Sequence, residues 1–242
     1  MFKIFKKGFN YSQDGRGNRL VYHLFGCNLA CPWCSNPEGL FYVDKKSYVE
    51  VSVDELVNEV ISSKPLFFDG GGVTFTGGEP TLQFDDLKDA LIKLKSVGIN
   101  TCIENNGTSS RLFELFPFVD ELIMDFKHYD NKVHTEIIGL DSSIIKKNID
   151  LALEKHPDLL IRTVLISGFN TSDDDLKGFI DFFKGKNTQN ARFEFLPYHE
   201  YGKVKWTKCN KTYTMQNAYI SDEILQKFER QYTINNLKVV RT

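Results

Sequence analysis

Three cysteines lie within eight residues of the chain, in the stretch Gly26–Pro37 and at the spacing C-x3-C-x2-C. Three thiolates this close together either share a metal centre or repel one another as they ionise. Clustered cysteines are the usual ligands of an iron–sulfur cluster, and a cluster of four irons normally takes four protein ligands. Cys27, Cys31 and Cys34 supply only three, so one iron would stay open, as one position does in catalytic zinc sites. An open iron can bind a substrate.

Two other interpretations of these cysteines stay open at this point. A zinc ion could be held by the three thiolates with His23 as a fourth ligand, although structural zinc sites usually bring their cysteines as two separated pairs. The three cysteines could also be unrelated buried residues. Their spacing also fits one face of a helix, but Pro32 within the run opposes a regular helix and favours a loop around a bound group.

The elements that must position this loop alternate between strands and helices. An apolar run at 20–25 predicts a buried strand that leads into the cysteine loop, and further strands are expected at 72–76, 99–104, 122–125, 159–166 and 192–196. Helices are expected at 52–63, 84–97, 109–116 and 132–155, from 172 onward, and at 222–232. Six such units with short links predict an α/β fold with a parallel sheet and helices outside. Residues 1–18 carry little pattern, and we expect one domain over residues 1–242.

Polar residues follow each predicted strand at its carboxyl end, where the loops of an α/β sheet converge and ligands bind. All of them fall on one rim, whereas ordinary surface loops would place such residues on both rims about equally. Gly77 and Gly78 would let a ligand approach the backbone, and Glu79 could accept hydrogen bonds from an ammonium group. These loops are the cysteine loop, Gly77–Glu79, Glu104–Asn106, Asp125–Lys127, Ser167-Gly168 and Pro197–His199.

Each of these residues also has an ordinary structural interpretation. The glycines could serve a turn, Asp125 and Lys127 lie on the same side of an extended segment and could form a structural ion pair, and His199 could be a core or surface residue. Cys102 lies in the middle of a predicted strand, where a small buried apolar residue is expected. Cys209 has no predicted role.

Composition limits the class of protein. A hydrophobic share of 41% over 242 residues can bury a sizeable core, and 13% aromatic residues argue against disorder. The net charge of −2 gives no reason to expect nucleic acid or a membrane as partner. No apolar run approaches the length of a membrane span. The five cysteines are odd in number and three are clustered, so we expect no disulfide framework and a reducing, cytoplasmic location.

The chain resembles the radical S-adenosylmethionine (SAM) superfamily, because the cysteine spacing, with Trp33 just before the last cysteine, is followed by Gly-Gly-Glu-Pro at 77–80. It is more closely similar to the glycyl-radical-enzyme activating enzymes, of which the pyruvate formate-lyase type is the best known. The last matching stretch is the most telling, because generic radical SAM proteins lack it. The matching stretches are Asp14–Arg19, Val73–Pro80, Asn106-Gly107, Asp125–Lys127 and Leu196–Trp206.

This resemblance implies a partial (β/α)6 barrel and a reaction in which a reduced [4Fe–4S] cluster splits SAM. The resulting 5′-deoxyadenosyl radical would abstract hydrogen from a backbone glycine of a partner glycyl radical enzyme. A flavodoxin or ferredoxin-type protein would donate the electron. The implied residues are Cys27, Cys31 and Cys34 for the cluster, Gly77, Gly78, Glu79, Asn106, Asp125, Lys127 and His199 for SAM, and Asp14 and Arg19 for the partner.

The sequence departs from the family pattern at several points. The usual proline of the Asp-Gly-Pro-Gly loop is Arg16, and Glu104-Asn105 replaces the usual Asp-Thr, which bears on a monovalent cation site associated with Asp125. Residues 35–70 contain no further cysteine, so a single cluster is expected. The alternatives are a radical SAM enzyme that acts on a small molecule or peptide, and a zinc-binding module without catalysis.

Overall fold

The computed structural model describes residues 1–41, 43–44 and 47–242, and one eight-stranded sheet organises them. The strands follow the order β3-β1-β2-β4-β5-β6-β7-β8, and the six from β2 to β8 run parallel. The predicted α/β class, with six parallel strands in a partial barrel, is confirmed. The strand bounds are β1 Phe2–Tyr11, β2 Asn18–Leu24, β3 Val49–Val51, β4 Gly72–Gly77, β5 Thr101–Asn105, β6 Glu121–Asp125, β7 Leu159–Leu165 and β8 Ala191–Pro197.

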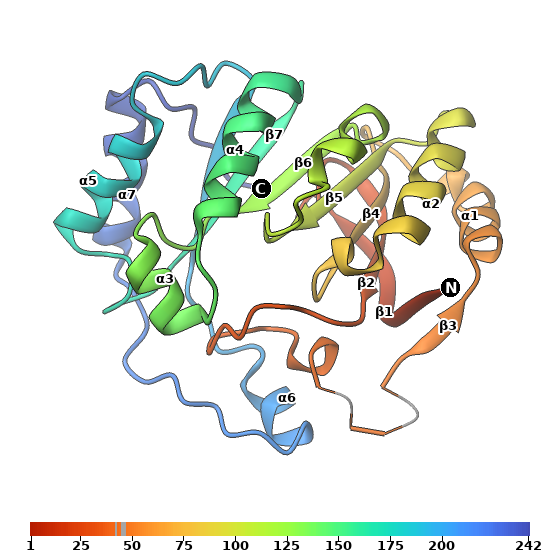
Figure 1. The fold of residues 1–242 in the computed structure, drawn as a ribbon, viewed down its shortest axis with the longest axis horizontal. Coiled ribbons are helices and arrows are strands. Elements are labelled where there is room, and N and C mark those ends of the chain that lie inside the picture. Colours follow the sequence, from red (N-terminus) through yellow and green to blue (C-terminus); the bar gives the residue numbers. More distant parts are fainter. Residues whose placement is uncertain (42, 45–46) are drawn as a thin grey trace.

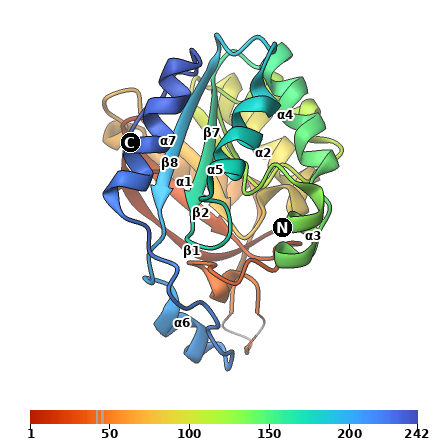
Figure 2. The ribbon, with the colours of Figure 1, turned by 90° about the vertical axis from the view of Figure 1, so that its left-hand side faces the viewer.

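Helices cover the outer face of the curved sheet and leave its inner face free (Figure 1). The short helix α6 differs, because it lies at one end of the molecule beside the segment that carries the cysteines (Figure 2). The α-helices are α1 Val53–Ser62, α2 Phe84–Ser96, α3 Asn131–Ile138, α4 Ser143–Lys155, α5 Asp173–Phe183, α6 Lys203–Lys208 and α7 Asp222–Ile234. Within the described part of the chain, four 3-10 segments, η1 to η4, occupy Pro37–Gly39, Lys64–Leu66, Pro80–Gln83 and Leu112–Phe118.

The two faces of the sheet carry different kinds of buried side chains. Side chains alternate along a strand, so neighbours in sequence point to opposite faces. On β7, Ile161 joins the large apolar core between sheet and helices, whereas the neighbouring Arg162 joins a buried ion-pair network that borders the candidate site. Cys102 is fully buried in a small apolar group with Ile123 and Leu160, as predicted for a mid-strand cysteine. The main apolar core therefore lies outside the barrel, and the inner face carries both the small apolar group around Cys102 and the buried ion-pair network.

Local sequence signals fix most helix ends. Ser52 and Glu55 form a reciprocal capping box at the start of α1, and Ser172 and Asp175 do the same for α5. Helix α2 ends just before Gly98, whose φ of +69° a glycine adopts without strain.

Several elements differ from the prediction, and one of them is the three-residue strand β3, which was not predicted. Residues 1–18, expected only as an approach segment, contain β1, which pairs antiparallel with β2 and β3. Its pattern is weak because the strand is mostly exposed beyond Ile4. The helix predicted at 109–116 is instead the 3-10 segment η4, which has Pro117 inside it. Helix α6 has only six residues and was not predicted.

Among the described residues, none of the helices is both long and apolar enough to cross a bilayer.

Candidate active site

A cavity of about 220 Å³ lies at the carboxyl ends of the parallel strands, against the cysteine loop. The register of β2 and β4 places Leu24 opposite Gly77, so the cysteine loop starts beside the loop that follows β4. Nine of the twelve predicted site residues line this cavity: Cys27, Cys31, Cys34, Gly77, Gly78, Asn106, Asp125, Lys127 and His199. Five of the six loops expected on this rim contribute residues to the cavity, whereas Ser167-Gly168 does not line it.

The three cysteines are free and largely buried. Burial raises the pKa of each thiol to about 11, and the nearby Lys127 acts in the opposite direction on all three. Neutral thiols are therefore expected near pH 7 when nothing is bound. A metal centre would supply the positive charge that keeps three such sulfurs deprotonated.

Several N–H groups point at these sulfurs. The backbone N–H of Leu29 lies 3.5 Å from Cys27 Sγ, and that of Asn36 lies 3.4 Å from Cys34 Sγ. The side-chain amide of Asn106 lies 3.8 Å from Cys27 Sγ. Such donors stabilise cluster-bound thiolates, so the donor set suits an iron–sulfur cluster. Among the described residues, no three His, Cys, Asp or Glu side chains are grouped so as to hold a metal ion, so the fit rests on the shared cavity and these donors.

Gly77 and Gly78 line the cavity as predicted, and both also lie close to the backbone of residues 23–26. A Cβ at Gly77 would lie 2.4 Å from the backbone nitrogen of Leu24, and one at Gly78 would lie 1.9 Å from the carbonyl oxygen of Gly26. The Gly78 N–H also donates to the Leu24 carbonyl at 2.9 Å. These glycines let the start of the cysteine loop pack directly against β4.

Glu79 does not line the cavity. Its side chain is fully buried, and it accepts hydrogen bonds from the backbone N–H of Asn106 at 2.7 Å and of Thr81 at 3.0 Å. Burial raises the pKa of this carboxyl to about 7, against the effect of these donors. The structure thus uses Glu79 to tie the loop after β4 to the loop after β5. Both carboxylate oxygens are engaged within the protein, and the contact with a ligand ammonium group stays a prediction.

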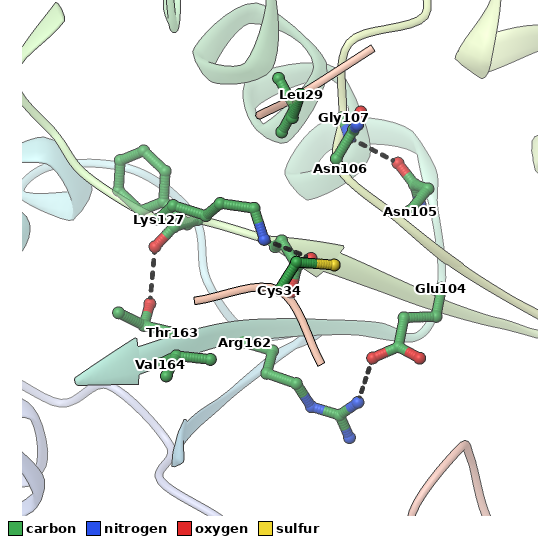
Figure 3. Close-up of polar contacts among 12 residues, drawn as sticks. Leu29, Cys34, Glu104, Asn105, Asn106, Gly107, Lys127, Arg162, Thr163 and Val164 are labelled. Atoms are coloured by element: carbon green, nitrogen blue, oxygen red, sulfur yellow. Dashed lines mark hydrogen bonds and ion pairs between the residues drawn. The ribbon is translucent and has the colours of Figure 1, made fainter. Parts of the chain in front are cut away.

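Lys127 and Asp125 form an ion pair of 2.8 Å at the cavity wall. Burial alone would lower the pKa of Lys127, but Asp125 and the sulfurs of Cys31 and Cys27 outweigh it, so the pKa is raised. Lys127 therefore stays charged. Figure 3 shows Lys127 with Cys34 and, on the neighbouring strands, the pair formed by Glu104 and Arg162.

The ion pair between Glu104 and Arg162 was not predicted from the sequence. Arg162 bonds Glu104 and also Glu194 on β8, the latter at 2.8 Å, and its side chain is 6% exposed. Thr76 donates to the other oxygen of Glu104 at 2.8 Å. Burial raises the pKa of Glu104 although Arg162 lowers it. An arginine within an apolar strand was the available signal, since a buried charge needs a partner.

A larger cleft of about 910 Å³ opens beside the cavity, between residues of β1 and β2 on one side and β8 on the other. His199, Arg162 and Glu104 line both spaces. The His199 ring stacks on Tyr201 with 4.2 Å between centroids, and burial lowers its pKa. The cavity and the cleft therefore share the wall formed by these three residues.

The two predicted partner residues both hydrogen-bond to Thr74, but they differ in burial: Asp14 is half-buried and Arg19 is buried. Asp14 lines the cleft and bonds Asn10, and its carbonyl accepts from Thr74 Oγ1 at 2.6 Å. Arg19 is fully buried, and its guanidinium donates to Thr74 Oγ1 at 2.7 Å and to Asn100 Oδ1 at 2.9 Å. The expectation that Arg19 grips a partner is therefore corrected, because its donors are engaged inside the protein.

Comparison with known proteins gives one family match. The model of the radical SAM superfamily matches residues 21–183. The chain is 34% identical to a pyruvate formate-lyase-activating enzyme of Staphylococcus epidermidis, covering 93% of this chain and 92% of that protein. It is 32% identical to the enzyme of the same name from Staphylococcus aureus, over 90% of each chain.

Solved structures of similar proteins superpose on this chain. A domain of pyruvate-formate lyase-activating enzyme from Bacteroides vulgatus superposes with a TM-score of 0.59 and 27% identity, covering 70% of this chain and 98% of that one. Streptococcus suis SuiB bound to S-adenosylmethionine superposes with a TM-score of 0.66 over 91% of this chain and 49% of that one. At 17% identity the likeness to SuiB concerns the fold alone.

Proposed function

Since the chain belongs to the radical SAM superfamily and, within it, to the family of pyruvate formate-lyase-activating enzymes, we propose that it is an activating enzyme for a glycyl radical enzyme. It would carry one [4Fe–4S] cluster and SAM. One observation supports this most strongly: three free cysteines share a cavity with the polar loops of four other strands, and a larger cleft shares part of the lining of that cavity.

Cys27, Cys31 and Cys34 would hold the cluster, which supplies the electron that splits SAM into methionine and a 5′-deoxyadenosyl radical. The N–H groups of Leu29 and Asn36 would stabilise the thiolates. Gly78 keeps the cysteine loop seated on β4, so the three sulfurs face one space.

The remaining cavity residues would bind and orient SAM. The Lys127–Asp125 pair offers one cation and one carboxylate to the zwitterionic methionine end, and Asn106 and His199 offer neutral hydrogen-bonding groups. His199 titrates below its ordinary pKa, so it is neutral near pH 7 and does not repel the sulfonium. Glu104 and Asp125 would bind no monovalent cation, because each already has a cationic partner within the protein.

The cleft would admit the glycine-bearing loop of the partner, with Asp14 on its wall. A hydrogen atom would pass from the glycine Cα to the 5′ carbon of the adenosyl group, which leaves the unpaired electron on the glycine. A flavodoxin or ferredoxin-type protein would deliver the electron. We take residues 1–242 as one radical SAM domain for this purpose.

The test uses anaerobically reconstituted protein with SAM, dithionite and a pyruvate formate-lyase as partner. The partner is labelled with glycine deuterated at Cα. We expect 5′-deoxyadenosine that carries deuterium, and a glycyl radical signal that is a doublet with ordinary glycine and collapses with the label. Cleavage of SAM without a partner signal would instead favour a small-molecule or peptide substrate. No cleavage at all would refute the reaction class.

A further inference from the structure

Helix α6 packs on the outside of the cysteine loop, although 172 residues of chain separate Trp206 from Cys34. The indole Nε1–H of Trp206 donates to the backbone carbonyl of Cys34 at 2.9 Å. Trp206 is buried, and its ring meets Phe41 and Tyr213 edge-on at 5.8 and 5.7 Å between centroids. The contact is therefore held in place by packing as well as by the hydrogen bond.

A second contact secures the next peptide unit. The ammonium of Lys205 donates to the carbonyl of Ser35 at 2.9 Å and to Asn36 Oδ1 at 3.0 Å, and it pairs with Glu38 at 2.7 Å. Because Lys205 and Trp206 are adjacent, two consecutive carbonyls of the cysteine loop are bound by two consecutive side chains of one helix. Both carbonyls are thereby held toward α6 and away from the cavity.

Gly202, just before α6, brings the helix this close. A Cβ at this position would lie 2.7 Å from both the Cys34 carbonyl oxygen and the Ser35 Cα, nearer than real Cβ atoms come to such neighbours. The same segment carries His199, three residues earlier, which lines the cavity. One short segment therefore touches the last cysteine from outside and the cavity from inside.

The orientation of these carbonyls decides where the following N–H groups point. With the Cys34 and Ser35 carbonyls bound to α6, the backbone N–H of Asn36 is directed at Cys34 Sγ at 3.4 Å. Hydrogen bonds to ligand sulfur raise the reduction potential of an iron–sulfur cluster and hold the ligand in place. The side chains of α6 would therefore influence the reduction potential through the backbone of residues 34–36, without touching the cluster.

We propose that Gly202, Lys205 and Trp206 form a clamp that positions Cys34, so that α6 sets both the retention and the reduction potential of the cluster. Lys205 and Trp206 are positioning residues, since they act through the backbone of residues 34–36. This inference rests on the proposed function, because it requires a cluster on Cys34. It goes beyond that function by assigning a role to the end of the Leu196–Trp206 stretch, which SAM binding alone does not explain.

The test compares reconstituted wild type with Trp206→Phe, which keeps an aromatic ring, although a smaller one, but removes the indole N–H, and with Lys205→Met, which keeps the aliphatic chain. Tyr213→Phe is the matched control, because it loses a 2.7 Å hydrogen bond to Tyr198 in the same aromatic group without touching residues 34–36. Lys205→Arg keeps a cationic donor and should restore wild-type behaviour. We measure iron release to a chelator, the midpoint potential, and the melting temperature of the cluster-free protein.

Trp206→Phe and Lys205→Met are expected to release iron roughly 10-fold faster, as other changes behind a metal ligand do. Their midpoint potentials should be more negative than that of wild type, with melting temperatures close to that of Tyr213→Phe. Release rates and potentials equal to wild type would overturn the clamp. A uniform loss of iron in all four variants, the control included, would also overturn it, since general destabilisation would then explain the result. If wild type itself holds no cluster, the proposed function fails instead.

Discussion

Replacing Arg162 with methionine should destabilise the protein strongly, and more so at high pH. The change leaves Glu104 and Glu194 without their cationic partner, and their side chains are only 18% and 2% exposed. Removing one partner of a buried ion pair typically costs about 3–5 kcal/mol, because an uncompensated charge remains. For a chain of this size each kcal/mol lowers the melting temperature by about 2–4 °C, so a fall of at least roughly 6 °C is expected.

The pH dependence follows from the sign of the shift at Glu104. Burial already raises its pKa in the folded protein, and loss of Arg162 removes an influence that lowers it. A carboxyl whose folded pKa lies above its unfolded value, about 4.3, contributes stability at low pH that is lost as pH rises through the folded pKa. The difference in melting temperature between wild type and Arg162→Met should therefore be larger at pH 8 than at pH 5.

Thermal denaturation at both pH values measures this, with two further variants. Arg162→Met combined with Glu104→Gln removes one unpaired charge and should regain part of the loss at pH 8. Lys88→Met breaks the more exposed pair with Glu114 and should cost no more than about 1 kcal/mol at either pH. The reasoning would be refuted if Arg162→Met lowered the melting temperature as little as Lys88→Met does. It would also be refuted if the fall in melting temperature caused by Arg162→Met became smaller as pH rises.

Three other predictions concern single positions. Cys31→Ser should abolish the cluster while Cys102→Ser retains about four irons per chain, as iron and sulfide analysis will show; a normal cluster in the first variant would contradict the ligand assignment. Asp125→Ala and His199→Ala should weaken SAM binding roughly 10- to 150-fold by calorimetry, the usual loss for a hydrogen bond to a charged ligand, and unchanged affinity would remove them from the SAM site. Arg19→Met should lower the melting temperature with SAM affinity unchanged, because its donors are spent inside the protein; an unaltered melting temperature would count against that burial.

Sequence reasoning predicted the parallel sheet and the rim of the site because both depend on short-range signals. Buried parallel strands are apolar runs, and the residues that end them must meet at one edge. It failed where the deciding partner is distant in the chain. Arg162 meets Glu104 across 58 residues, and only the fold could reveal that the charge is paired. It also failed at β1, whose antiparallel pairing leaves most of the strand outside the apolar core, and at α6, which has too few turns to show a helical period.

The distance in sequence between α6 and the loop that it holds has a consequence for biosynthesis. The parallel strands lie in the sheet in chain order, so each new unit can pack on those already made. The cysteine loop follows the first of them, yet Trp206 lies 172 residues later. At ordinary rates of translation, the ribosome needs roughly 10–30 s to cover that interval. During that time the cysteine loop of the nascent chain lacks its contacts with α6. Cellular assembly factors could deliver iron and sulfide to the cysteines before α6 is synthesised.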